Sequence, residues 1–123
     1  MKTRILRKFS FDAAHRLFTM PEGHKCRRMH GHTYCCEVVC EGEVDPAVGF
    51  FLDYGDLKAA IEPVVAELDH QYLNDIPGLE VPTAEVIAKW LYDRLKPSLP
   101  SLVVLRLWET PSNGVEYAPG DGV

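Results

Sequence analysis

The chain has 123 residues, of which 46% are hydrophobic and 25% charged, and its formal net charge at pH 7 is −5. This composition is typical of a globular protein, and we expect residues 1–123 to form a single domain. The negative charge argues against a nucleic-acid-binding surface, which needs an excess of lysine and arginine. No apolar run approaches the roughly 20 residues that span a bilayer, and the N-terminus lacks the features of a signal peptide. We therefore expect a cytoplasmic protein whose four cysteines are thiols or ligands, not disulfides.

Two strands are predicted in the N-terminal third. The segment "TRILRKFSFDAAH" at residues 3–15 alternates with period 2, and residues 16–29, with Pro21 and Gly23, form a loop. A second strand begins near His30 and ends before a turn at residues 43–49. Its even positions share one face, and they are His30, His32, Tyr34, Cys36, Val38 and Cys40.

Two helices and two further strands follow. Asp53 or Asp56 caps the first helix, which Pro63 is expected to kink or interrupt. Thr83 caps the second helix, which ends before Pro97. Residues 101–110 form a β-rich run, and the turn "PSNG" leads into the short strand "VEYA".

The order ββααββ predicts an α+β fold, with a largely antiparallel four-stranded sheet and both helices on one face. Such a sheet has two open edges, and an open edge invites pairing with another chain. We therefore expect several copies of the chain to join their sheets.

Three histidines are predicted to meet at one end of this sheet. His15 ends the first strand on its core-facing side, and His30 and His32 begin the second strand on the same side. In an antiparallel hairpin the three rings lie together, where an apolar face would not accept them without a partner. Three histidines with an open fourth position are typical of a catalytic zinc site, so we favour a metal over hydrogen-bonded core histidines.

The remaining members of "HKCRRMHGHTYCC" are expected to have different roles. Cys26 is flanked by Lys25 and two arginines, which favour its thiolate form, so it is a candidate acid, base or nucleophile. It could instead be the fourth zinc ligand. His24 is expected on the solvated surface, whereas Cys36 and Cys40 should pack as small hydrophobic residues and Cys35 should point to the other face.

Several segments together resemble the 6-pyruvoyltetrahydropterin synthase family. In chain order they are "FDAAH", "CRRMHGH", "FLDYGDLK", "LDHQYLND", "PTAEVIAKWL" and "WET", and they extend from about Phe9 to Tyr117. The spacing Cys-X3-His-Gly-His is similar to that of the family's queuosine-pathway branch, which forms 6-carboxy-5,6,7,8-tetrahydropterin. The resemblance implies the tunnelling fold, in which ββααββ subunits join edge to edge, commonly as a trimer stacked into a hexamer.

The resemblance also implies roles for individual residues. It implies that His15, His30 and His32 bind zinc, one ion per subunit, that Cys26, Asp69 and His70 are catalytic, and that Glu109 anchors the pterin ring. Asp69 and His70 are adjacent in sequence and need not contact each other. Without the resemblance, Glu109 would be interpreted as an exposed strand-end glutamate paired with a lysine.

Other residues near these motifs have simpler explanations. Helix capping accounts for Thr83 and Asp53, and Glu85 suits the first turn of a helix. Lys25, Arg27 and Arg28 are candidates for binding a triphosphate, although charges in a loop are usually only solvated.

The leading hypothesis is a zinc-dependent carbon–carbon lyase. The resemblance implies that it converts 7,8-dihydroneopterin triphosphate to 6-carboxy-5,6,7,8-tetrahydropterin, acetaldehyde and triphosphate. The alternatives are the pyruvoyl-forming reaction of the same family and a non-catalytic module that binds zinc or pterin. No nucleic-acid or membrane partner is expected.

Overall fold

Two long antiparallel strands form the centre of the sheet in the computed structural model, which describes residues 1–121. Strand β1 (Lys2–His15) and strand β2 (His30–Glu43) pair along their whole length, from Lys2 opposite Glu43 to His15 opposite His30. The alternation in both strands fixes this register, because a shift by one residue would turn the apolar face of either strand to solvent. The predicted hairpin is confirmed, and the end of it that the loop of residues 16–29 connects brings the histidines together.

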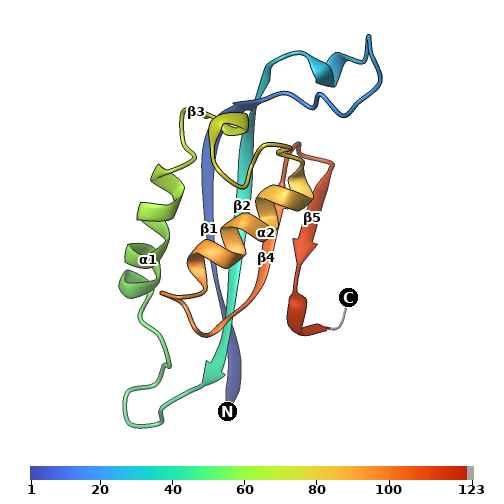
Figure 1. Cartoon of the computed structure of the whole chain (residues 1–123). Coiled ribbons are helices and arrows are strands. Elements are labelled where there is room, and N and C mark those ends of the chain that lie inside the picture. The colour runs from blue at the N-terminus through green and yellow to red at the C-terminus, as the bar shows by residue number, and fades with distance from the viewer. Residues whose placement is uncertain (122–123) are drawn as a thin grey trace.

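The sheet has five strands, in the order β3-β1-β2-β4-β5 (Figure 1). Strand β4 (Leu102–Trp108) and strand β5 (Gly114–Tyr117) are antiparallel to their neighbours, as expected. The prediction of four strands was wrong, because β3 (Gln71–Tyr72) adds a two-residue strand parallel to β1. Two residues are too few to give a period-2 signal.

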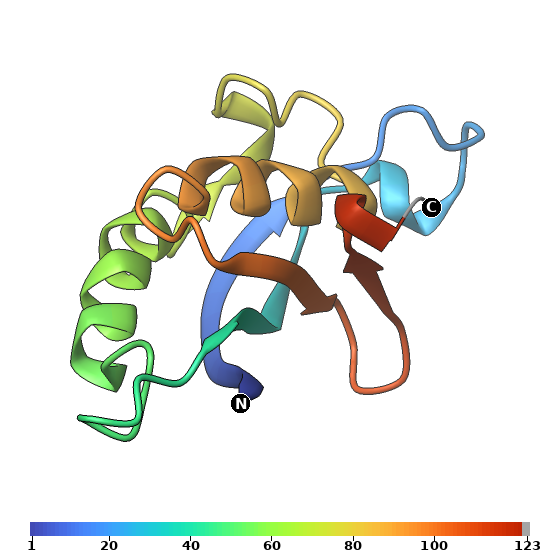
Figure 2. The same cartoon turned by 90° about the horizontal axis from the view of Figure 1, so that it is seen from below.

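Both helices cover the same face of the sheet, as predicted (Figure 2). Helix α1 (Tyr54–Ala66) begins at Asp53, whose carboxylate accepts the N–H of Gly55. The helix continues through Pro63 for three further residues, so the expected interruption at this proline does not occur. Helix α2 (Ala84–Leu95) begins at Thr83, whose hydroxyl accepts the N–H of Val86. Both predicted caps are confirmed.

The core lies between this helical layer and the sheet. Phe11 stacks on Tyr34 with ring centroids 5.0 Å apart, and Cys36 and Cys40 are buried in the same core. Cys35 is exposed on the opposite face, so the interpretation of these three thiols is confirmed, and all four cysteines are free. No helix in the part of the chain described by the structure has the length and apolar character needed to cross a membrane.

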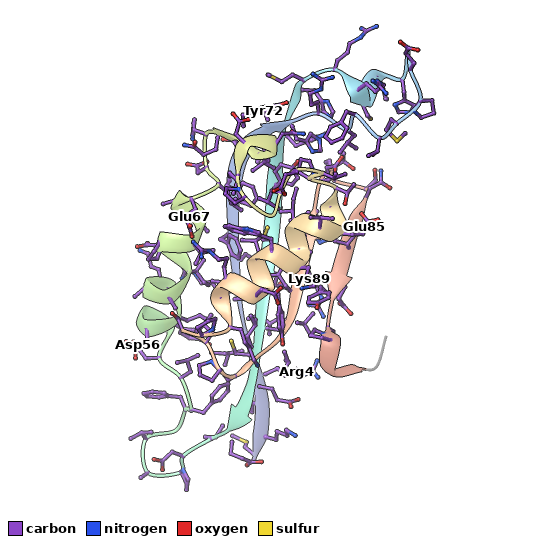
Figure 3. All side chains as sticks on the ribbon, viewed as in Figure 1. Arg4, Asp56, Glu67, Tyr72, Glu85 and Lys89 are labelled. Atoms are coloured by element: carbon purple, nitrogen blue, oxygen red, sulfur yellow. The ribbon has the colours of Figure 1, made fainter. Side chains whose placement is uncertain are left out.

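The sheet is uneven at the end that carries the histidines. Strand β4 pairs with β2 only from Cys35 to Cys40, so residues 30–34 of β2 extend past the end of β4. The loop of residues 16–29 projects from this same end (Figure 1), and Tyr72 lies there too, far from Arg4 and Asp56 (Figure 3). The extension of β2 leaves room beside the histidines, and the candidate site lies there.

Candidate active site

His15, His30 and His32 lie together, as predicted from their positions on the two strands. One ring nitrogen from each lies within 4.8 Å of the corresponding nitrogens of the other two. His15 is fully buried, whereas His30 and His32 are half-buried and nearer to solvent. The three rings meet edge to face, with centroids 4.5–5.1 Å apart. Among residues 1–121, Cys26 does not join this group, so the three nitrogens form a site with an open side.

Backbone carbonyls fix the orientation of two of the rings. Nδ1 of His15 donates to the carbonyl of Pro82 at 2.8 Å, and Nδ1 of His30 donates to the carbonyl of Arg28 at 2.7 Å. A neutral imidazole has a single N–H, so Nε2 of each ring carries only a lone pair. These two Nε2 atoms face each other at 3.0 Å. Two facing lone pairs repel each other, and a cation bound between them removes that repulsion.

His32 provides the third nitrogen. Its buried Nε2 atom has no hydrogen-bond partner in the structure, and a buried nitrogen without a partner costs free energy. Oε1 of Glu109 lies 3.3 Å away, but the contact lacks the alignment of a hydrogen bond. The three nitrogens therefore suit a divalent metal ion, and the carbonyl bonds of His15 and His30 are the usual outer support of metal-bound histidine.

Burial favours the neutral, metal-binding form of His15 and His32. Desolvation lowers the pKa of His15 and of His32, and it outweighs the opposing attraction of the Glu109 carboxylate. The hydroxyl of Tyr34 lies 3.3 Å from Nδ1 of His15, and burial raises the pKa of this phenol, so it is uncharged. The floor of the site is thus made of neutral groups.

A pocket of about 340 Å³ opens from the triad beside the end of β4. Its lining residues are Lys25, Cys26, His30, His32, Glu109 and Thr110. Glu109 reaches the pocket because it follows the last residue of β4, where its N–H donates to the carbonyl of Asn113. The pocket therefore combines a half-buried thiol, a carboxylate and two imidazoles from three separate segments, and it brings together His30, His32, Cys26 and Glu109.

The loop residues around Cys26 differ from expectation. His24 is half-buried, and its Nδ1 accepts the N–H of Cys26 at 3.1 Å, so its assignment to the solvated surface was wrong. The guanidinium of Arg27 donates to the carbonyls of Phe18 and Met20, both at 2.9 Å. These contacts hold Arg27 within the loop, whereas Lys25 lines the pocket. Loop contacts of this kind have no periodic sequence signal.

Asp69 and His70 form a separate pair at the β3 edge of the sheet. Oδ2 of Asp69 lies 3.0 Å from Nδ1 of His70, so the two residues do contact each other. Oδ1 of Asp69 accepts the N–H of Asp12, which is the main cause of the lowered pKa of Asp69. His70 has φ = 60°, an uncommon value for a residue other than glycine, and its N–H donates to the carbonyl of Asp12 at 2.6 Å.

The His70 ring does not line the pocket that contains Cys26. His70 is largely exposed and lines a neighbouring groove of about 510 Å³ with Asp12, Gly31, Thr33 and Tyr72. His32 borders both the groove and the pocket. Within one chain, therefore, the Asp69–His70 pair and the Cys26 thiol lie on two sides of His32.

We expect the metal-free protein to lose stability as the pH falls from about 7 to 5. The folded state lowers the pKa of His15 and His32 below the unfolded value of about 6.5, so the unfolded chain binds protons more readily in this range. The stabilisation is fully present above about pH 6.5 and is lost as the pH falls below it. Thermal unfolding in a chelator should show a melting temperature lower by roughly 5 °C at pH 5.

The His32→Gln variant is the control, because it removes one of the two titrating rings and should flatten this dependence. The carboxylates of Asp69 and Glu41, whose pKa values are lowered, titrate below this range and do not interfere. A melting temperature that is constant or rises between pH 7 and 5 contradicts the expectation.

Comparison with known proteins agrees with this fold. The family profile described as "6-pyruvoyl tetrahydropterin synthase" matches residues 4–120. The chain is also similar to a solved 6-pyruvoyl tetrahydropterin synthase from Caenorhabditis elegans, at 30% identity with a TM-score of 0.88 over 96% of each chain. The fold is thus that of a family of pterin-processing enzymes. The chain belongs to the 6-pyruvoyl tetrahydropterin synthase family.

Two relatives with different named activities have higher sequence identity to the chain. The chain is 42% identical to the dihydroneopterin monophosphate aldolase of Pyrococcus furiosus, over 94% of this chain and 97% of the relative. It is 40% identical to the 6-carboxy-5,6,7,8-tetrahydropterin synthase of Synechocystis, over 92% and 91%. The family resemblance seen in the sequence motifs is confirmed, and relatives with different named activities lie at nearly equal distances.

Proposed function

We propose that the protein is a zinc-dependent carbon–carbon lyase that converts 7,8-dihydroneopterin triphosphate and water to 6-carboxy-5,6,7,8-tetrahydropterin, acetaldehyde and triphosphate. The observation that carries this proposal is the shared pocket, in which an open histidine triad, the Cys26 thiol and the Glu109 carboxylate lie together. The relatives named 6-carboxy-5,6,7,8-tetrahydropterin synthase, at 40% and 33% identity, support it.

His15, His30 and His32 would hold one zinc ion through their ring nitrogens. Three imidazoles with an open fourth position are the donor set of catalytic zinc. A zinc ion held there would act as a Lewis acid on the hydroxyl oxygens of the pterin side chain. The repulsion between the Nε2 atoms of His15 and His30, together with the unpartnered Nε2 of His32, supports this assignment.

Cys26 and Glu109 would act on different parts of the substrate. The Glu109 carboxylate, at one end of the pocket, would accept two hydrogen bonds from the amino group and ring N–H of the pterin. This contact orients the flat ring and directs its side chain toward the triad. Cys26 would then accept or donate the proton that moves when the side chain is cleaved. Lys25 lines the same pocket and is the cation that we assign to the phosphates.

Asp69 and His70 would supply a second proton-transfer group, contributed by a neighbouring subunit. The carboxylate holds Nδ1 of His70, so Nε2 is left to meet a substrate. The pair belongs to the β3 edge, whereas Cys26 lies in the pocket near the end of β4. Strand β1 pairs with β3 only at Ala13 and Ala14, and the long edge left beside it suits the joining of sheets into a trimer or hexamer.

The proposed setting is the cytoplasmic synthesis of queuosine, because the product named for the Synechocystis relative is the one we assign to this chain. The aldolase reaction is a second candidate, favoured by the 42% identity to the Pyrococcus furiosus relative. Both reactions break a carbon–carbon bond of the side chain, so the triad and thiol suit either. They differ in the phosphate carried by the substrate and in the aldehyde released.

Product analysis distinguishes these reactions. Purified zinc-loaded protein is incubated with 7,8-dihydroneopterin triphosphate and, separately, with the monophosphate, and the products are identified by mass spectrometry. We expect acetaldehyde and a 6-carboxy pterin from the triphosphate. An aldehyde that still carries phosphate, formed from the monophosphate alone, would establish the aldolase instead. A pyruvoyl pterin without acetaldehyde, or no reaction with either substrate, would contradict the proposal.

A further inference from the structure

Both backbone polar groups of Cys26 are hydrogen bonded inside the loop at residues 16–29. Its N–H donates to Nδ1 of His24 at 3.1 Å, and its carbonyl accepts the N–H of Leu17 at 2.7 Å. Backbone donors in a projecting loop are ordinarily satisfied by water. The N–H and the carbonyl of Cys26 are instead both hydrogen bonded to other residues of the loop.

His24 makes its bond as the N-cap of a one-turn 3-10 helix, Lys25–Arg27. Its backbone is extended, at φ = −69° and ψ = 137°, and its ring accepts the N–H two residues ahead, which is the arrangement of an N-cap. Serine, threonine, aspartate and asparagine are the usual residues at such a position. A histidine serves only through a ring nitrogen that carries no proton.

Arg27 forms hydrogen bonds to the first half of the same loop. Its guanidinium spans the loop to the carbonyls of Phe18 and Met20, so the segment after Cys26 is tied to the segment that precedes it. The N–H of Arg27 also donates to the carbonyl of His24 at 3.0 Å, which closes the helical turn. Cys26 thus lies between two side chains that bind backbone groups, and its own side chain remains available to the pocket.

We propose that His24 is a positioning residue, which places the Cys26 thiol at the pocket by capping the turn that carries it. The proposal rests on the proposed function, in which Cys26 moves a proton during cleavage. His24 contacts no substrate in this account. It acts only through the N–H of Cys26, and another side chain that accepts the same N–H performs the same task.

Amide hydrogen exchange tests the capping bond without reference to catalysis. In the His24→Ala variant the amides of residues 24–28 should exchange about fivefold faster, the factor that corresponds to a cap of about 1 kcal/mol. His24→Asn should restore slow exchange, because the asparagine oxygen accepts the same N–H. Alkylation of Cys26 by iodoacetamide, followed on the isolated peptide, should accelerate in His24→Ala for the same reason. Exposed Glu22, changed to alanine, is the control in the same loop.

Turnover measurements test whether the hydrogen bond between His24 and Cys26 contributes to catalysis. We expect kcat of His24→Ala to fall by about tenfold to a hundredfold with KM little changed, because a small displacement of a reacting group is costly. His24→Asn should recover most of kcat. Unchanged exchange and alkylation in His24→Ala would overturn the proposal, and so would faster exchange with normal kcat in a protein whose Cys26→Ala variant is inactive. Failure of the wild-type protein on every pterin substrate contradicts the proposed function, while exchange and alkylation still decide whether His24 positions the thiol.

Discussion

Replacement of His30 by alanine is expected to abolish metal binding and turnover while the chain stays folded. His30 supplies one of only three nitrogens, and two imidazoles do not retain zinc against a chelator. The metal content should fall from about one ion per chain to below about a tenth, as measured by elemental analysis after dialysis. His30 is half-buried at the first position of β2, so the metal-free variant should melt within roughly 5 °C of the metal-free wild type.

His70→Ala is the matched control, because it removes a histidine that lies at the β3 edge, outside the triad. This variant should keep its metal and lose only turnover. If His30→Ala retains a full complement of metal, the triad is not the site. If it unfolds, the metal has a structural role, and the open-site interpretation is wrong.

The second large effect is expected from Cys26→Ala, which should reduce kcat by about a thousandfold while the metal content stays at one ion per chain. Loss of a proton-transfer group typically costs 10²–10⁴ in rate, and the thiol is not among the nitrogens that meet at the triad. Turnover and metal content are measured on the same preparation. Cys35→Ala removes an exposed thiol on the other face of the sheet and should leave both values unchanged.

Loss of metal from Cys26→Ala would identify this thiol as a fourth ligand, and unchanged turnover would remove it from the mechanism. Mixed oligomers extend the test to the Asp69–His70 pair. Cys26→Ala and His70→Ala subunits, each inactive alone, should regain part of the activity after they are unfolded and refolded together, because some sites then have both residues intact. If the mixture stays inactive, the two residues do not come from different subunits.

The histidine triad was predictable because strands have a period of two. The parity of His15, His30 and His32 places their rings on one face, and the alternation of apolar residues fixes the register of the hairpin. Cys36 and Cys40 follow from the same parity. The caps at Asp53 and Thr83 were predictable for a related reason, since an N-cap depends on residues only two or three positions apart.

The features that were not predicted from the sequence lie where several weak contacts compete. Pro63 was expected to kink or interrupt α1, and the interruption does not occur, because the proline lies near the helix end where few further bonds depend on it. The strand β3 is too short to leave a pattern, and it forms because Asp69 and His70 bind the backbone of Asp12. His24 was interpreted as a solvated residue because histidine is not among the usual N-cap residues, although its contact is only two positions away. Arg27 was interpreted in the same way because nothing local in the sequence specifies that it meets the carbonyls of Phe18 and Met20.

The sequence by itself therefore determined the two-helix, antiparallel layout, the histidine triad, and the family to which the chain belongs, because each depends on local periodicity or on motifs that are read directly. Only the tertiary structure decided that β2 extends past β4 to open a pocket, and that this pocket contains Cys26 and Glu109. It also decided that Pro82 orients His15, that His24 caps the turn of Cys26, and that His70 lies at another edge. These contacts join residues up to 67 positions apart, and their geometry follows from how strands of unequal length and an irregular loop pack together.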